Sequence, residues 1–142
     1  AAEQALKLKK PRECLAEFDH FVDLQPTFWP ALYFSGIAMH RLGESDSALD
    51  MLDAARRLSP EQPEVLHRMA LLFSERGNPK RALELMDEAL GIRADAASLY
   101  ATRAQVLADL GRREEARACV EQGLQRNPSD RELLRMRQQF GA

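Results

Sequence analysis

Residues 41–60 read RLGESDSALDMLDAARRLSP, and residues 75–94 read ERGNPKRALELMDEALGIRA. The second stretch repeats the plan of the first, and its turn glycine recurs at a spacing of 34 residues, at Gly43, Gly77 and Gly111. No insertion breaks this register. A fixed period of this length is typical of a chain built from stacked copies of one small unit, each of which buries its apolar face against its neighbours.

Two further series keep the same period. Small residues stand where helices have to approach closely, because only a small side chain lets two axes come near the lower end of the usual 8–10 Å separation; they are Cys14, Ala48, Ala82 and Ala116. Prolines separate successive units, because proline does not fit a helix interior; the places in this series are Pro26, Pro60 and Pro128, with Ala94 in the remaining one. We therefore expect repeated helical hairpins.

Local signals place the helix ends. The three glycines stand where a left-handed residue ends a first helix. Asn78 before Pro79 predicts an N-cap with proline at the first helical position, and Ser45 is the expected cap one repeat earlier. Ser129 and Glu132 have capping-box spacing. No stretch alternates apolar and polar residues with β-branched enrichment, so we expect no strand.

A 34-residue period with a turn glycine, a small residue five positions later and a proline near the end resembles the tetratricopeptide repeat family. The resemblance implies an all-α fold, a right-handed α-solenoid of antiparallel helix pairs with a C-terminal capping helix. We expect one domain over residues 1–142, divided into a partial repeat (1–28), three full repeats (29–62, 63–96, 97–130) and a capping helix (131–142). Ser35 and Arg103 stand where the family carries a large apolar residue, which puts close packing there in question.

The two ends differ in character. Residues 1–28 match only the second half of a repeat, so we expect a truncated array whose N-terminal face, around Phe18 and Phe21, lacks cover and offers a surface for self-association. Residues 131–142 carry polar residues where an internal repeat would carry packing ones. This pattern predicts a polar capping helix that turns Leu133, Leu134 and Phe140 inward and ends the array.

Composition excludes several classes of protein. The 20 basic and 22 acidic residues are interspersed and give a net charge of −2, so the sequence lacks the basic stripe that nucleic-acid binding requires. No apolar run is long enough to span a membrane, and no signal-peptide core is present, although a removed signal or anchor would leave the same sequence. Cys14 and Cys119 lie three repeats apart, too far for a disulfide. We expect free thiols and a cytoplasmic location, in a bacterial source.

In this family the first helices line a concave groove, and positions 2, 5, 9, 12 and 13 of each tend to face it. Carried over, the resemblance implies these partner-binding residues: Tyr33, Ile37, His40, Arg41, His67, Leu71, Ser74, Glu75, Ala101 and Gln105. The same kind of position also holds Glu64, Ser98, Ala108, Asp109, Glu132, Arg135 and Gln139. We expect a protein or peptide partner with apolar anchor residues. The alternative is that Ile37 and Leu71 only pack against neighbouring helices.

The sequence shows no arrangement of residues typical of a catalytic or metal-binding site near these positions. His40 and His67 are too far apart in height for one metal ion, and the sequence predicts no cofactor and no enzyme activity. The family's carboxylate clamp for chaperone tails is not matched, since its positions hold Tyr33, Ile37, Arg68, Ser98 and Thr102. We expect a non-catalytic interaction scaffold. The alternatives are a docking or regulatory arm of a larger enzyme and a bacterial secretion chaperone.

Overall fold

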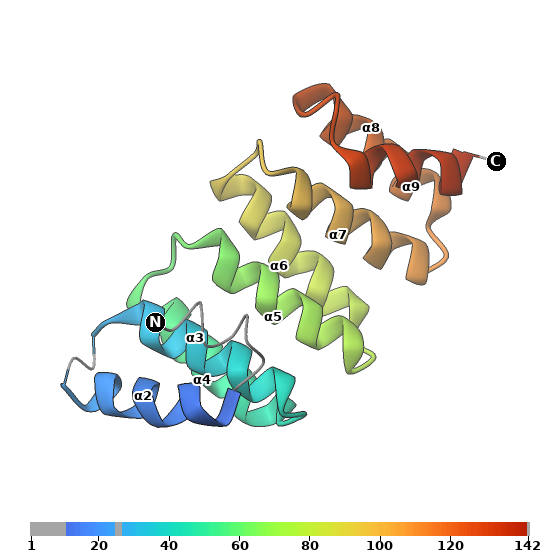
Figure 1. Ribbon diagram of the computed structural model, residues 1–142. Coiled ribbons are helices and arrows are strands. Elements are labelled where there is room, and N and C mark those ends of the chain that lie inside the picture. Colours follow the sequence, from blue (N-terminus) through green and yellow to red (C-terminus); the bar gives the residue numbers. More distant parts are fainter. Residues whose placement is uncertain (1–10, 25–26, 142) are drawn as a thin grey trace. The chain divides into compact units, whose positions relative to one another are not determined.

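The structure of the chain is a computed structural model that describes residues 11–24 and 27–141 (Figure 1). Within these residues every regular element is a helix, which confirms the all-α prediction. The helices are α2 (Pro11–Leu24), α3 (Trp29–Arg41), α4 (Ser45–Leu58), α5 (Pro63–Glu75), α6 (Pro79–Ile92), α7 (Ala97–Asp109), α8 (Arg113–Arg126) and α9 (Arg131–Gly141).

The helix starts keep the period of the sequence. The first helices of successive repeats begin at residues 29, 63, 97 and 131, and the second helices at 45, 79 and 113. Each start therefore lies 34 residues after its counterpart. The predicted repeat boundaries coincide with the starts of the first helices.

The chain divides into two compact units, Ala1–Leu72 and Phe73–Ala142, and the division falls within α5. We call them unit 1 and unit 2. Unit 1 contains α2, α3, α4 and most of α5; unit 2 contains the end of α5 and α6 to α9. A single domain over the whole chain stays a prediction.

The turn glycines have the predicted left-handed backbone. Gly43, Gly77 and Gly111 have φ of 81°, 80° and 78°. After Gly43, the N–H of Glu44 donates to the Met39 carbonyl at 2.9 Å, which closes the end of α3. Any residue with a Cβ would be strained at this φ. The backbone of each turn therefore requires glycine, which explains why glycine recurs every 34 residues.

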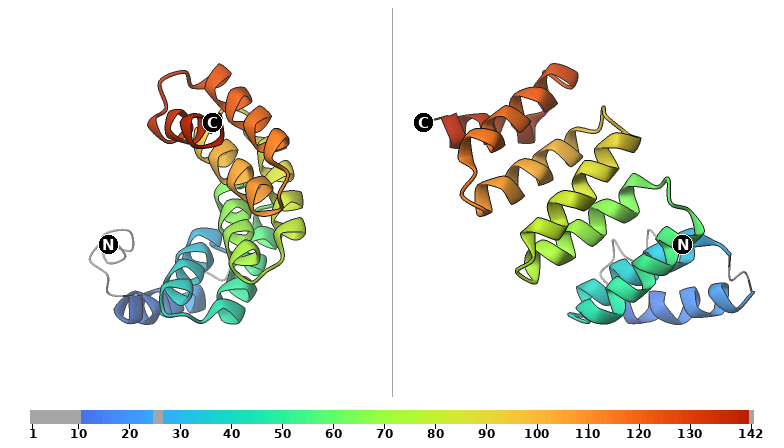
Figure 2. Two further views of the ribbon diagram at one scale, coloured as in Figure 1. Left: turned by 90° about the vertical axis from the view of Figure 1, so that its right-hand side faces the viewer. Right: turned by 180° about the vertical axis from the view of Figure 1, so that it is seen from behind.

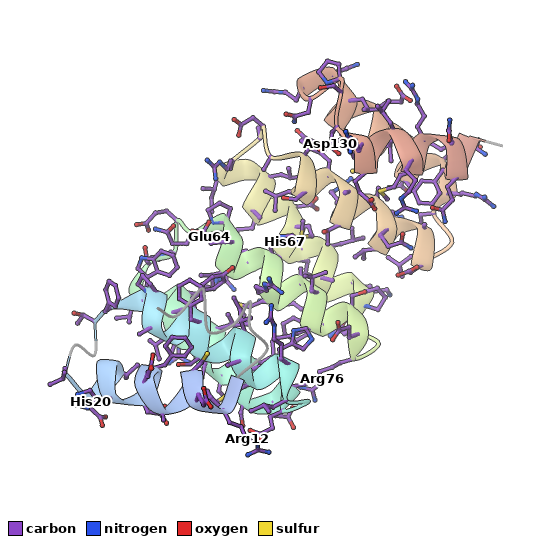
Figure 3. The ribbon with its side chains drawn as sticks, viewed as in Figure 1. Arg12, His20, Glu64, His67, Arg76 and Asp130 are labelled. Carbon is purple, nitrogen blue, oxygen red and sulfur yellow. The ribbon has the colours of Figure 1, made fainter. Side chains whose placement is uncertain are left out.

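Of the three predicted caps, one is confirmed and two are wrong. The Asn78 side chain accepts from the N–H of Arg81 at 3.3 Å, with Pro79 at the start of α6. Ser45 is itself the first residue of α4, and the preceding Glu44 makes no side-chain cap. Before α9 the cap is Asp130, labelled in Figure 3, whose Oδ1 accepts from the N–H of Leu133 at 3.0 Å. Ser129 lies one residue before this cap and two residues before the start of α9.

In unit 1, α3 packs against both α2 and α4. The contact with α4 is close at Gly36, where an added Cβ would lie 2.8 Å from Leu52 Cγ and 3.3 Å from the Ala48 carbonyl oxygen. The contact with α2 is built on Cys14 and Phe18, which are buried with Ile37 and Ala38 of α3. Small residues thus stand where the helices cross, as the sequence predicts.

In unit 2, α7 packs against α6, α8 and α9, and α8 also packs against α9 (Figure 2). Gly123 of α8 lies where three of these helices meet. An added Cβ there would lie 2.8 Å from Tyr100 Cβ of α7 and 2.8 Å from Leu133 Cδ1 of α9. The capping helix buries Leu133 and Phe140 as predicted, and also Met136, whereas Leu134 is only half-buried.

The two residues that depart from the family pattern are accommodated differently. Ser35 is buried, and its hydroxyl donates to the Ala31 carbonyl one turn earlier at 2.8 Å. Arg103 of α7 reaches α6, where its Nε donates to Asp87 Oδ1 at 2.6 Å. The Ser35 bond lies within α3 and the Arg103 bond joins two helices, so each polar side chain has a hydrogen-bond partner at its position.

Gly123 and Gly91 form a matched pair for testing the three-helix junction. We expect Gly123→Ala to lower the free energy of unfolding by about 1–3 kcal/mol, because Tyr100 Cβ is rigidly attached to the backbone and has to move. Gly91→Ala, on the exposed side of α6 with no atom within 4 Å of the added Cβ, should instead raise it by about 0.5–1 kcal/mol. Urea unfolding followed by circular dichroism measures both. Equal effects of the two substitutions would contradict the close approach at Gly123.

Candidate partner-binding surface

The predicted groove residues differ widely in exposure. In unit 1, Arg41 is exposed, whereas Tyr33, His40, His67 and Leu71 are half-buried. In unit 2, the exposed residues are Glu75 and Gln105, and the half-buried ones are Ser74 and Ala101. These nine side chains are therefore all at least partly accessible.

Ile37 is the exception, and its place in the groove is revised. Its side chain is 5% exposed and packs in the cluster with Cys14, Phe18 and Ala38. A partner has no access to a side chain buried in this way. For Ile37 the packing alternative holds, whereas Leu71 keeps an accessible part.

A row of aromatic rings runs beside Ile37. The Trp29 and Tyr33 rings meet edge to face with centroids 5.9 Å apart, and Tyr33 meets Phe34 in the same way at 5.2 Å. Phe34 stacks on Phe18 of α2 at 6.0 Å. The sequence prediction included Tyr33 but missed Trp29 and Phe34, although the spacing of four between residues 29 and 33 places two aromatic rings on one helix face.

The predicted self-association surface is also revised. Phe18 is only 4% exposed, because Phe34 and Ile37 of α3 cover it. The Phe21 side chain lies outside the described residues. Phe18 therefore belongs to the core between α2 and α3 and offers no exposed surface to a second copy.

Unit 2 carries a hollow of about 460 Å³ between α7, the start of α8 and the C-terminal part of α9. Its lining combines two amides, one acid, one base and an apolar part: Gln105, Gln139, Asp109, Arg113, Ala108 and Phe140. Gln105, Ala108, Asp109 and Gln139 all occupy predicted groove positions. The structure thus brings predicted residues of two successive first helices to one hollow. Sequence reasoning missed Arg113, because no groove position falls on a second helix.

The two glutamines of this hollow are held by their own helices. Gln105 donates from Nε2 to Asp109 Oδ1 at 3.0 Å, and Gln139 accepts at Oε1 from Arg135 Nη1 at 3.4 Å. Arg135 also pairs with Glu132, which lowers the pKa of that carboxyl group. The polar lining is therefore ordered by contacts one helical turn away.

Neither cysteine has the character of a reactive thiol. Both are free and buried, and burial raises the pKa of the Cys14 thiol and of the Cys119 thiol. For Cys119 the Arg103 guanidinium acts in the opposite direction, and the thiol lies 3.4 Å from the Tyr100 carbonyl oxygen. Cys14 serves as a small packing residue between α2 and α3, as its place in the repeat predicts, and Cys119 is likewise buried.

Two kinds of site are absent from the described part of the chain. Among residues 11–24 and 27–141, no three His, Cys, Asp or Glu side chains are grouped so that they hold a metal ion. Over the same ranges, no helix has both the length and the apolar character needed to cross a membrane.

His67 on α5 is half-buried, and desolvation lowers its pKa, with a smaller contribution from Arg68 (Figure 3). A lowered pKa means that the folded chain takes up a proton less readily than the unfolded chain, whose histidine titrates near about 6.5. Protonation therefore favours unfolding. Above the unfolded pKa, His67 is neutral in both states and does not lower the free energy of unfolding. As the pH falls below that pKa, the unfolded chain takes up the proton more readily, and the free energy of unfolding decreases.

We expect His67→Gln to reduce the loss of stability between about pH 7.5 and about pH 5.5, because glutamine does not titrate. Urea midpoints of the wild type and the variant at both pH values measure the effect. Gln122→Ala, which removes no titratable group at an exposed position on α8, is the control and should keep the pH dependence of the wild type. If His67→Gln and Gln122→Ala behave alike, the desolvation of His67 is not what makes stability depend on pH.

Comparison with known proteins identifies relatives among solved structures. A thermophilic TPR protein of Thermus thermophilus, TTC0263, matches with a TM-score of 0.89 and 21% identity over 98% of this chain and 77% of that one. YrrB, described as a TPR protein with an unusual peptide-binding site, matches with a TM-score of 0.73 and 20% identity over 89% and 66%. The first TPR of Spaghetti (RPAP3), solved with an HSP90 peptide, matches with a TM-score of 0.74 and 18% identity over 80% and 92%. These likenesses show the fold.

No curated protein matches the chain. Family models, in contrast, match its sequence. The tetratricopeptide repeat family matches it over residues 36–98 and again over residues 73–140. Together with the helix starts at a 34-residue period and the left-handed turn glycines, these matches show that the chain belongs to the tetratricopeptide repeat family.

Proposed function

We propose that this chain is a non-catalytic interaction scaffold that holds a segment of a partner protein against the accessible side chains of its first helices. The observation that carries the proposal is the hollow of unit 2, where the half-buried Ala108 supplies the apolar contact, because Phe140 is almost fully buried, and four polar or charged side chains line the rest. Polar groups held at fixed places can orient a ligand through hydrogen bonds. Two relatives of the same fold, YrrB and the RPAP3 domain, are described with a peptide-binding site and a bound peptide.

Each unit carries its own set of proposed contact residues. On unit 1 the set is Tyr33, His40, Arg41, His67 and Leu71, where the aromatic ring and the leucine provide apolar contact. On unit 2 the set is Ser74, Glu75, Ala101 and Gln105, together with the residues that line the hollow, of which Gln105 is one. All of them lie on helices except for the turn that leads into α8, so the partner bears most of the ordering entropy of binding.

The partner we propose is a protein or peptide with apolar anchors. The interspersed charges of the chain give no continuous basic surface for nucleic acid. An acidic chaperone tail is also disfavoured, although the RPAP3 domain binds an HSP90 peptide, because the positions of the family's carboxylate clamp hold Tyr33, Ile37 and other residues without the required charges. At the first of these positions Tyr33 makes ring contacts with its neighbours.

Filling the hollow tests the proposal. Ala108→Trp places a large ring in the space that the partner would occupy, and we expect capture of the partner from an extract of the source organism to fall by about tenfold or more. Quantitative mass spectrometry of proteins retained by wild type and variant measures the loss. Ala118→Trp, on the exposed side of α8 and outside the hollow, is the control and should retain the same proteins as wild type.

Circular dichroism confirms that both variants are folded. A partner retained equally by Ala108→Trp and wild type would move the site away from unit 2's hollow. A partner lost with both tryptophan variants would show a general surface effect, which also counts against the hollow.

A further inference from the structure

The two charged side chains that line the hollow stand at helix ends. Asp109 is the last residue of α7, and Arg113 is the first residue of α8. A helix carries a partial negative charge at its C-terminus and a partial positive charge at its N-terminus. The acid and the base therefore each repel the end of their own helix, which disfavours the fold.

The other repeats do not combine these two features. The positions that correspond to Asp109 and Arg113 hold Arg41 and Ser45 in the first full repeat and Glu75 and Pro79 in the second. In the first of these repeats the arginine suits the C-terminal end of its helix, and neither the serine nor the proline carries a charge. The third full repeat is thus the one in which both helix ends carry a charge of the unfavourable sign, and it is these two charges that line the hollow.

No ion pair among the described residues offsets either charge. Arg112, the residue before α8, pairs with Glu115 through Nη2 and Oε2 at 2.6 Å, which lowers the pKa of that carboxyl group. Arg113 takes part in no hydrogen bond or ion pair within residues 11–24 and 27–141, and Asp109 accepts a hydrogen bond from the neutral Gln105 alone. Both side chains are exposed. The hollow therefore presents one anion and one cation, each without a partner of opposite charge in this part of the chain.

Charges that lower stability and make no ion pair within the fold point to a contact with another molecule, because local rules are broken most often at functional sites. We propose that Asp109 and Arg113 are the specificity-determining residues of the hollow, an inference that rests on the function proposed above. The partner segment carries a basic side chain that pairs with Asp109 and an acidic side chain that pairs with Arg113. In the complex each charge gains the oppositely charged partner that it lacks in the chain alone.

The two charges select against segments of a single charge sign. A segment with only acidic side chains places one of them near Asp109, and a segment with only basic side chains places one near Arg113. Like charges brought together in this way oppose binding, which discriminates between partners more strongly than it changes the best affinity. The partner class is thus a segment with one basic and one acidic side chain and a net charge near zero.

Stability measurements test the first part of the inference. Asp109→Asn and Arg113→Gln each remove one opposed charge, and we expect both to raise the urea midpoint of unfolding followed by circular dichroism. Asparagine keeps an oxygen that accepts from Gln105. Glu114→Gln is the control of opposite sign, because Glu114 is an acid in the first turn of α8 and suits that helix end, so its loss should lower the midpoint. A lower midpoint for Asp109→Asn and Arg113→Gln would overturn the inference, because the two charges would then serve the fold.

Binding measurements test the second part. Peptides are selected from a random library displayed against the wild-type chain, and one selected peptide is synthesised with a fluorescent label for anisotropy. We expect Asp109→Asn and Arg113→Gln each to bind it about threefold to fivefold more weakly at low ionic strength, the range of one accessible ion pair, and the difference to shrink at high ionic strength. Glu121→Gln, at an exposed position of α8 outside the hollow, should bind like wild type.

Exchanging the charges on both sides gives the sharpest test. The double variant Asp109→Arg and Arg113→Asp presents the same two charges in exchanged places, and a second peptide has the basic and acidic residues of the selected one exchanged. We expect the double variant to reject the selected peptide and to bind the exchanged one, whereas wild type does the reverse. Neither exchange alters a net charge, so a general electrostatic effect does not produce this result.

The outcomes separate this inference from the proposed function. Binding that Ala108→Trp abolishes but that no charge variant changes would overturn the recognition of charges and leave the hollow as a binding site. Selected peptides that do not share one basic and one acidic residue would also overturn it. Selected peptides that Ala108→Trp does not affect, or a library that yields no binder, would count against both the inference and the proposed function.

Discussion

The close approach of helices is the constraint on which this structure depends. At Gly123 a single Cβ would lie 2.8 Å from atoms of both α7 and α9, and at Gly36 it would meet Leu52 at the same distance. Contacts this short leave no space for a larger side chain at the crossings. Each hairpin therefore needs its small residue at a fixed position. The 34-residue register follows, because an insertion between a crossing and its turn would bring a larger side chain into the contact.

This constraint explains why the fold was predictable from the sequence. Small residues, turn glycines and prolines act through local geometry. Each of them recurs in successive repeats, so several repeats independently predict the same arrangement of helices. The caps were less predictable. Asn78 was recognised from the proline after it, whereas at α9 both Ser129 and Asp130 are good capping residues, and only the position at which the helix begins decides between them.

The candidate site was predictable only in part, because a repeat position fixes where a side chain starts but not what covers it. Ile37 and Gln105 occupy the same position of their repeats, yet Ile37 is buried and Gln105 is exposed. The difference arises from neighbours: Cys14 and Phe18 of α2 are buried together with Ile37. That cover is a long-range contact between helices, and no pattern within residues 29–62 encodes it. The hollow of unit 2 likewise needs Arg113, which comes from a second helix.

The same position also shows how an array of similar units acquires surfaces of different character. It holds Ile37, Leu71, Gln105 and Gln139 in chain order, so it changes from aliphatic to carboxamide between one repeat and the next. Its backbone geometry is set by the crossings and is common to all four, which leaves the side chain free to vary without disturbing the packing. Where a neighbouring element covers the position, an aliphatic side chain adds to the core; where water reaches it, a carboxamide costs little stability and adds hydrogen-bonding groups. The core of unit 1 and the hollow of unit 2 therefore use different members of one repeated position within the same 34-residue pattern.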